Sequence, residues 1–125
     1  MVRSAHRPAP ERPQVLGKAV LRASEILGLN QAALAKVLGI SASSVSRLLT
    51  GDFHLTEHSK EWEFATLLVR LYRGLDAIMA SDETALRAWM SNQNTDLNAA
   101  PADLVITTQG LVDTVEYVDA YRARV

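Results

Sequence analysis

The sequence predicts an all-α protein, and three observations support this fold class. Apolar residues recur every three or four positions through most of the 125 residues, glycines follow several of these stretches, and no two segments alternate in the manner of paired strands. The chain is 48% apolar, which suits one compact domain or two very small ones. It contains no cysteine, which excludes disulfides, thiolate metal sites and a cysteine nucleophile.

The charges divide unevenly along the chain, although the net charge is only -1. Residues 1–74 hold ten basic and six acidic side chains (+4), and residues 75–125 hold three basic and eight acidic ones (-5). Such asymmetry indicates two different partners, although chance fluctuation along a short chain gives the same pattern.

The chain begins with an expected arm and a first helix. Residues 1–12 contain Pro8, Pro10 and three arginines with little apolar material, so we expect a flexible basic arm. Pro13 suits the first turn of a helix, and apolar residues follow it at helical spacing as far as Gly28.

Two short helices are predicted next, over Gln31–Leu38 and Ala42–Leu49. Gly39 permits the positive φ of a tight turn between them, and Ser41 is suited to cap the second helix. Ala35 is small where two steeply crossing helices approach each other. The spacing therefore predicts a helix-turn-helix.

This segment, within residues 15–51, resembles the Xre/phage-repressor class of helix-turn-helix domains. Short hydroxyl side chains allow a helix to enter the major groove, and an arginine can bond guanine bidentately, so we expect Ser43, Ser44 and Arg47 to reach base edges. The resemblance implies that the first of the two helices abuts a phosphate with its N-terminus, and that the protein binds paired half-sites as a dimer. The candidate DNA-binding residues are Gln31, Ser41, Ser43, Ser44, Ser46, Arg47 and Thr50.

Two alternatives stay open for this region. The first alternative is that the segment is an ordinary αα-hairpin with a polar outer face and does not bind DNA. The arm arginines Arg3, Arg7 and Arg12 either add phosphate or minor-groove contacts or form a solubilising tail.

The sequence after residue 56 predicts further helices. A long helix is expected from Glu57 to Met79, and Ser81 is the expected N-cap of the next one. Residues 91–107 are expected to be irregular, with Pro101 breaking any continuing helix. A last helix is expected over Thr108–Ala123.

Residues His54 to His58 match the H-x-x-E-H pattern of one class of zinc peptidases. That chemistry needs two histidine ligands on one helical face, whereas this match straddles an expected helix start near Thr56. No glycine-rich phosphate loop or G-x-S-x-G is present. We therefore expect no metal site, no cofactor and no enzyme activity.

A second set of pieces lies within residues 65–125: Ala85–Met90, Asn94, Leu97, Pro101–Leu104, Thr108, Gly110 and a last helix ending Tyr121-Arg122. In this order and spacing they resemble the toxin-binding domain of the Xre/MbcA/ParS antitoxins. The family places a glycine where this sequence has Asn98, a residue type that tolerates positive φ.

The resemblance implies a type II antitoxin whose partner is a RES-domain toxin, with an ADP-ribosyltransferase-like fold that acts on NAD. In that family the antitoxin's C-terminal region covers the entrance to the toxin's nucleotide pocket, and the complex represses its own operon. The acidic half would complement a basic nucleotide-binding surface, and exposed aromatic and arginine residues are common interface anchors. The candidate toxin-binding residues are Asp119, Tyr121, Arg122, Arg124 and Val125, with a frayed helix end as the alternative interpretation.

We expect an arm at 1–12, a helix-turn-helix DNA-binding domain at 13–55, and a helical dimerisation and toxin-binding domain at 56–125. No signal pattern and no run of ~20 apolar residues is present, so we expect a cytoplasmic homodimer without membrane contact. The alternative function is a free-standing Xre-like dimeric repressor whose second half only dimerises or senses a ligand.

Overall fold

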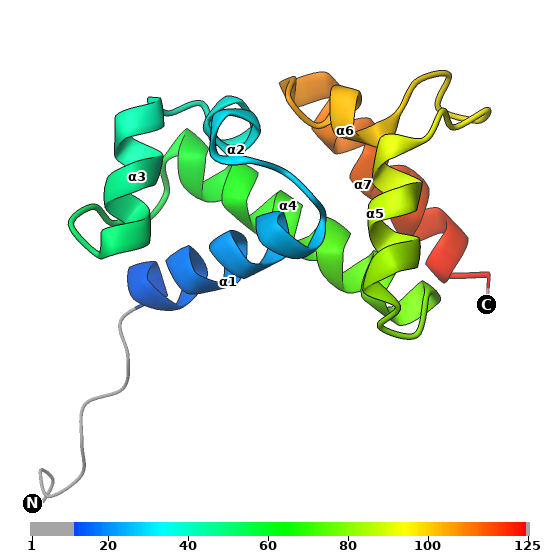
Figure 1. The fold of residues 1–125 in the computed structure, drawn as a ribbon, viewed down its shortest axis with the longest axis horizontal. Helices are drawn as coiled ribbons and strands as arrows, with labels where there is room; N and C mark the ends of the chain where they lie inside the picture. The colour runs from blue at the N-terminus through cyan, green and yellow to red at the C-terminus, as the bar shows by residue number, and fades with distance from the viewer. Residues whose placement is uncertain (1–11, 125) are drawn as a thin grey trace, which may run out of the picture.

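The computed structural model describes residues 12–124, so the predicted arm up to residue 11 and Val125 lie outside the described residues. The described chain folds into helices without a strand, which confirms the all-α prediction (Figure 1). The helices are α1 (Arg12–Ile26), α2 (Gln31–Leu38), α3 (Ala42–Thr50), α4 (Lys60–Ile78), α5 (Glu83–Ser91), α6 (Pro101–Leu104) and α7 (Thr108–Arg122).

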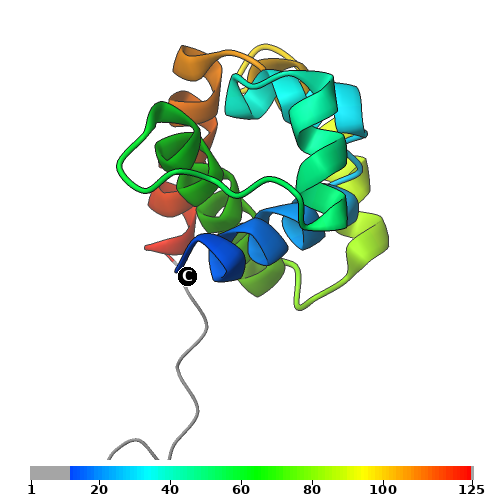
Figure 2. The same cartoon turned by 90° about the vertical axis from the view of Figure 1, so that its left-hand side faces the viewer.

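Helix α4 lies at the centre of the molecule and is 19 residues long. Its first part packs against α1 and α2, and the same helix also packs against α5 and α7. Figure 2 shows the end of the molecule where α1, α2, α3 and the start of α4 surround a common centre, which their buried side chains fill. The two halves are therefore joined by a continuous helix and not by a linker.

One cluster of buried apolar residues runs through both halves. Its largest fully buried side chains include Leu27, Leu34, Leu38, Leu55, Leu68, Leu71, Leu75, Leu86, Met90 and Leu111. Full burial of one such side chain stabilises a protein by about 1.5–3 kcal/mol. Because three of these leucines belong to α4, the same helix contributes to the packing of both halves.

Side-chain caps begin most of the longer helices. The residues Asn30, Ser41, Ser59, Asp82 and Thr107 precede α2, α3, α4, α5 and α7, and each accepts a hydrogen bond from the backbone N–H three residues further on. Gly39 ends α2 with a φ of 70°, which confirms the predicted tight turn before Ser41.

Two predicted helix starts are wrong. Asp82, and not Ser81, caps α5, because Ser81 has a φ of 62° and its hydroxyl donates to Asp76 at 3.2 Å. Helix α4 begins only after Ser59, three residues later than expected. Each start has two residues of a type that caps helices, Ser81 and Asp82 before α5, and Thr56 and Ser59 before α4. The local sequence alone does not decide which of the two is the cap.

The stretch expected to be irregular contains the short helix α6. Pro101 occupies the first turn of this helix, where its missing N–H needs no partner, so it starts a helix as well as ending the preceding segment. Asn98 has a φ of 61°, which confirms the predicted turn at the position where the family has glycine. Asn94 and Ala99 form an isolated antiparallel bridge across that turn.

Two glycines allow close approaches to α7. A Cβ atom on Gly74 of α4 would lie 2.8 Å from Cγ1 of Val118. A Cβ atom on Gly110 would lie 2.0 Å from the backbone oxygen of Leu104, at the connection between α6 and α7. The second contact is with backbone, which cannot move aside as the end of a side chain can.

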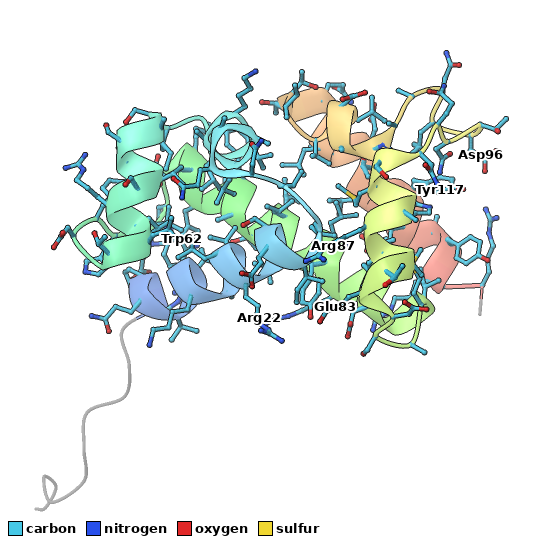
Figure 3. The ribbon with its side chains drawn as sticks, in the orientation of Figure 1. Arg22, Trp62, Glu83, Arg87, Asp96 and Tyr117 are labelled. Atoms are coloured by element: carbon cyan, nitrogen blue, oxygen red, sulfur yellow. The ribbon has the colours of Figure 1, made fainter. Side chains whose placement is uncertain are left out.

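Arg87 connects the second half to the end of α1. Its Nε donates to the carbonyl oxygen of Ile26 at 3.2 Å, and its Nη2 donates to that of Glu25 at 3.1 Å (Figure 3). The last carbonyls of a helix have no partner within that helix and carry partial negative charge, so a guanidinium is a favourable cap there. This contact helps to fix the orientation of α5 relative to α1.

We predict that Gly110→Ala lowers the free energy of unfolding by about 2–4 kcal/mol, because the added methyl group collides with the backbone of Leu104. Urea denaturation followed by circular dichroism measures the change. Glu116→Ala, at an exposed position of the same helix, is the control and should change stability by less than about 0.5 kcal/mol. Equal stability of the two variants would contradict the close packing of α6 on α7.

Candidate functional site

Helices α2 and α3 form the predicted helix-turn-helix. Their axes turn by 106° at the connection, within the range of roughly 90–120° that is typical of this motif. The inner faces are apolar, with Leu34, Leu38, Val45 and Leu48 buried. This packing leaves the opposite face of α3 free to meet a ligand.

The free face of α3 carries most of the predicted DNA-binding residues. Ser43, Ser46, Arg47 and Thr50 are exposed, and Ser44 is half-buried. Short hydroxyl side chains around one arginine allow a helix to lie deep in a major groove while the guanidinium reaches the bases. The geometry of α3 is therefore suited to reading DNA.

Two predicted residues lie at the start of a helix, and one of them, Ser41, caps it. The Ser41 hydroxyl accepts from the N–H of Ser44 at 3.1 Å and donates to the Ser44 hydroxyl at 2.9 Å, so it caps α3. Gln31 is exposed at the first position of α2, where Asn30 accepts from the N–H of Ala33 at 2.8 Å. Asn30 was not among the residues predicted from the sequence, although an asparagine before a helix is a cap signal.

Arg47 is held in place by neighbours on both sides. Its Nη2 donates to the Ser44 hydroxyl at 3.3 Å, and its guanidinium carbon lies 5.7 Å from the centre of the Phe53 ring, within the range of a cation–π contact. The Thr50 hydroxyl contacts Asp52 at 3.0 Å on the same side of the helix. Phe53 was not predicted as a functional residue, because its ring meets Arg47 only after the chain turns at the end of α3.

The two histidines of the H-x-x-E-H match lie outside any helix. Both are in the connection between α3 and α4, and His58 has a φ of 65°. They do not share a helical face, as predicted. Within residues 12–124, no three His, Asp or Glu side chains converge in a way that would hold a metal ion.

The predicted toxin-binding residues lie around the end of α7, and they do not form one patch. Tyr121 is 46% exposed and lines an apolar hollow of about 180 Å³ together with Trp89 and Tyr117. Arg122, the next residue, lines a different groove between α1 and α4. Arg124 is exposed.

Asp119 is engaged within the chain. Its carboxylate forms an ion pair of 2.5 Å with Arg70 of α4. Only about a third of the Asp119 side chain is exposed, so a partner that bound this carboxylate would compete with Arg70.

A tyrosine–aspartate contact fixes the rim of the hollow. The Tyr117 hydroxyl donates to Asp96 at 2.7 Å and so ties the loop before α6 to α7 (Figure 3). This hydrogen bond, together with partial burial, raises the pKa of Tyr117, because the phenolate would lose the bond and be repelled by the carboxylate. Neither residue was singled out from the sequence, because 21 positions separate them.

No single helix within the described range is long and apolar enough to cross a membrane. Helices α2 and α3 have the necessary length and apolar content only when taken together, and they are bent by 106° as the helix-turn-helix.

A helix-turn-helix whose second helix has an exposed polar face is typical of a DNA-binding protein. A family model for the antitoxin Xre-like helix-turn-helix domain matches residues 6–70, and a model for the antitoxin Xre/MbcA/ParS C-terminal toxin-binding domain matches residues 74–124. The chain therefore belongs to the Xre/MbcA/ParS-type antitoxins. No curated protein sequence matches it. The matched domains are regulatory and binding domains, which supports a type II antitoxin that binds DNA and a toxin.

We predict that Phe53→Leu weakens DNA binding about two- to fivefold, because Arg47 loses a cation–π contact of about 0.5–1 kcal/mol. Fluorescence anisotropy with a labelled DNA duplex from the region upstream of the protein's own gene measures the change. In an Arg47→Ala background the same substitution should have no further effect. Equal losses in both backgrounds would mean that Phe53 acts through the fold and not through Arg47.

Proposed function

We propose that this antitoxin neutralises a RES-domain toxin by covering the entrance to the toxin's nucleotide pocket, where the toxin would bind NAD. The observation that carries this proposal is the end of α7. Beyond Val118, which is buried, the last turn of α7 and the two described residues after it are exposed, and they include Tyr121, Arg122 and Arg124. Aromatic and arginine side chains of this kind are common anchors at interfaces.

The mechanism is non-catalytic, and it depends on where the two surfaces lie. Helix α3 and the end of α7 are at opposite ends of the molecule (Figure 1). A toxin bound at the end of α7 would leave α3 free, so the protein–toxin complex could still occupy DNA. This separation supports autorepression of the operon by the complex. We propose the cytoplasm as the compartment in which this takes place.

Operator recognition would use two copies of α3. A single helix-turn-helix reads only a half-site, so we propose a homodimer on a palindromic operator, with Ser43, Ser44 and Arg47 at base edges. The same proposal divides the chain after residue 55. Residues 13–55 would bind DNA, and residues 56–125 would form the dimer and bind the toxin. The basic arm, including Arg3 and Arg7, would add nonspecific phosphate contacts.

A free-standing dimeric repressor is the second candidate. The match of residues 74–124 to a toxin-binding domain favours the antitoxin, since a repressor without a toxin has no need of that domain. An adjacent gene for a RES-like protein, and its co-purification with this chain, would decide between the two.

Arg47→Ala should weaken binding to the protein's own operator by about 1–3 kcal/mol, roughly 5- to 150-fold, because a bidentate contact to guanine is lost. Binding to the operator and to a random duplex is compared by anisotropy. Lys36→Ala, which removes one exposed positive charge from α2, is the control and should leave the ratio of the two affinities unchanged. An unchanged ratio for Arg47→Ala as well would remove Arg47 from the base-reading set.

Deletion of residues 121–125 should abolish protection against the co-expressed toxin and leave operator affinity unchanged, because residues 121–124 are exposed and outside the core. Growth after toxin induction and operator binding are the two measurements. Glu116→Ala, an exposed change earlier on α7, should retain protection. Full protection by the truncated chain would contradict capture of the toxin by the end of α7.

A further inference from the structure

A long groove runs between α1 and α4, and it shares one residue, Arg122, with the proposed toxin-binding end of α7. Its volume is about 540 Å³, and none of its lining residues belongs to α2 or α3. Its floor is apolar, formed by Val15, Leu16, Ala19, Trp62 and Val69. Within the described chain, Val15 is 53% exposed and adds apolar surface to the lining of this groove.

Four arginines surround this floor, and none of the lining residues within the range 12–124 is acidic. They are Arg12, Arg70, Arg73 and Arg122. Arg12 pairs with Glu57 at 3.2 Å and lies over Trp62, and Arg70 pairs with Asp119. Arg73 and Arg122 have no ion pair with any residue in the range 12–124. Among the described residues, the groove therefore has two guanidinium groups without an ion pair next to an apolar surface.

The length of the groove limits the shape of its ligand. On α4 the lining residues run from Trp62 to Arg73, which is about 16 Å at a rise of 1.5 Å per residue. That distance equals about three turns of an α-helix. A helix with an apolar stripe can lie lengthwise in such a groove and place its flanking side chains at the rim.

We propose that this groove binds an amphipathic, acidic helix of about three turns from a partner protein. Leucine-type side chains on one face of the helix pack on Val15, Leu16 and Trp62, and flanking glutamates pair with Arg73 and Arg122. The proposal goes beyond neutralisation of the toxin and DNA binding, since the groove lies along α1 and α4 and has only Arg122 in common with the proposed toxin-binding residues.

Two other occupants fit less well. In a two-fold dimer through this groove the arginines of one copy would face those of the other, which is unfavourable. Duplex DNA would satisfy the arginines with phosphates, but it would leave the apolar floor without a partner, and the DNA-reading face of α3 lies elsewhere.

A synthetic helical peptide of 15 residues tests the proposal, with leucine at helical spacing on one face and glutamate on both flanks. Fluorescence anisotropy with the full chain should show saturable binding, and a matched peptide with glutamine for glutamate should bind at least about tenfold more weakly. Arg73→Glu and Val15→Asp should each weaken binding of the glutamate peptide by about tenfold or more. Lys18→Glu is the control, because it makes the same charge change at an exposed position of α1 outside this groove, and it should alter the affinity less than about twofold.

Circular dichroism of each variant confirms that it is folded. Absence of saturable binding by the glutamate peptide, or equal affinity for the glutamine peptide, would overturn the proposal. If Lys18→Glu weakens peptide binding as much as Arg73→Glu does, the effect of Arg73→Glu comes from the net charge of the protein. That result would also overturn the proposal. If Arg73→Glu weakens binding of a random DNA duplex as strongly as it weakens peptide binding, the groove is a phosphate-contact surface instead. None of these outcomes depends on protection from the toxin, so the proposed function is tested separately.

Discussion

Helix α4 packs against α1 and α2 and also against α5 and α7, and this shared packing is the constraint on which the rest of the molecule depends. Leu68, Leu71 and Leu75 of α4 are fully buried, and Gly74 lets α7 approach within contact of the α4 backbone. Arg87 adds a polar contact between α5 and the end of α1. With these interactions in place, the DNA-reading helix and the end of α7 are held in a fixed relation.

Helix α4 connects the region matched by the helix-turn-helix model to the region matched by the toxin-binding model without a break. The two family models meet within α4, between residues 70 and 74, where the helix is continuous. The division between the DNA-binding and toxin-binding parts is therefore one of surface and not of separate cores. A ligand that stabilises one half also stabilises the packing on α4 that the other half uses.

The uneven charge along the chain has a more complex basis than the sequence suggested. The positive first half contains the helix-turn-helix, yet α3 carries a single basic residue, Arg47. Arg12, Arg70 and Arg73 lie instead along the groove between α1 and α4, and Arg122 from the acidic half joins them. A count of charges along the chain cannot show this, because helix packing brings together residues that are more than a hundred positions apart.

The sequence by itself determined the features that depend on residues within about four positions of one another. These include the helical fold class, the turn at Gly39, the cap at Ser41 and the positive φ of Asn98, because caps and tight turns are set by local sterics and local hydrogen bonds. Only the tertiary structure decided which side chains meet across helices: Phe53 with Arg47, Arg87 with α1, Asp119 with Arg70, and the four arginines around one groove. Those pairs depend on which faces of the helices are buried and at what angle the helices cross, and both are consequences of the shared core around α4.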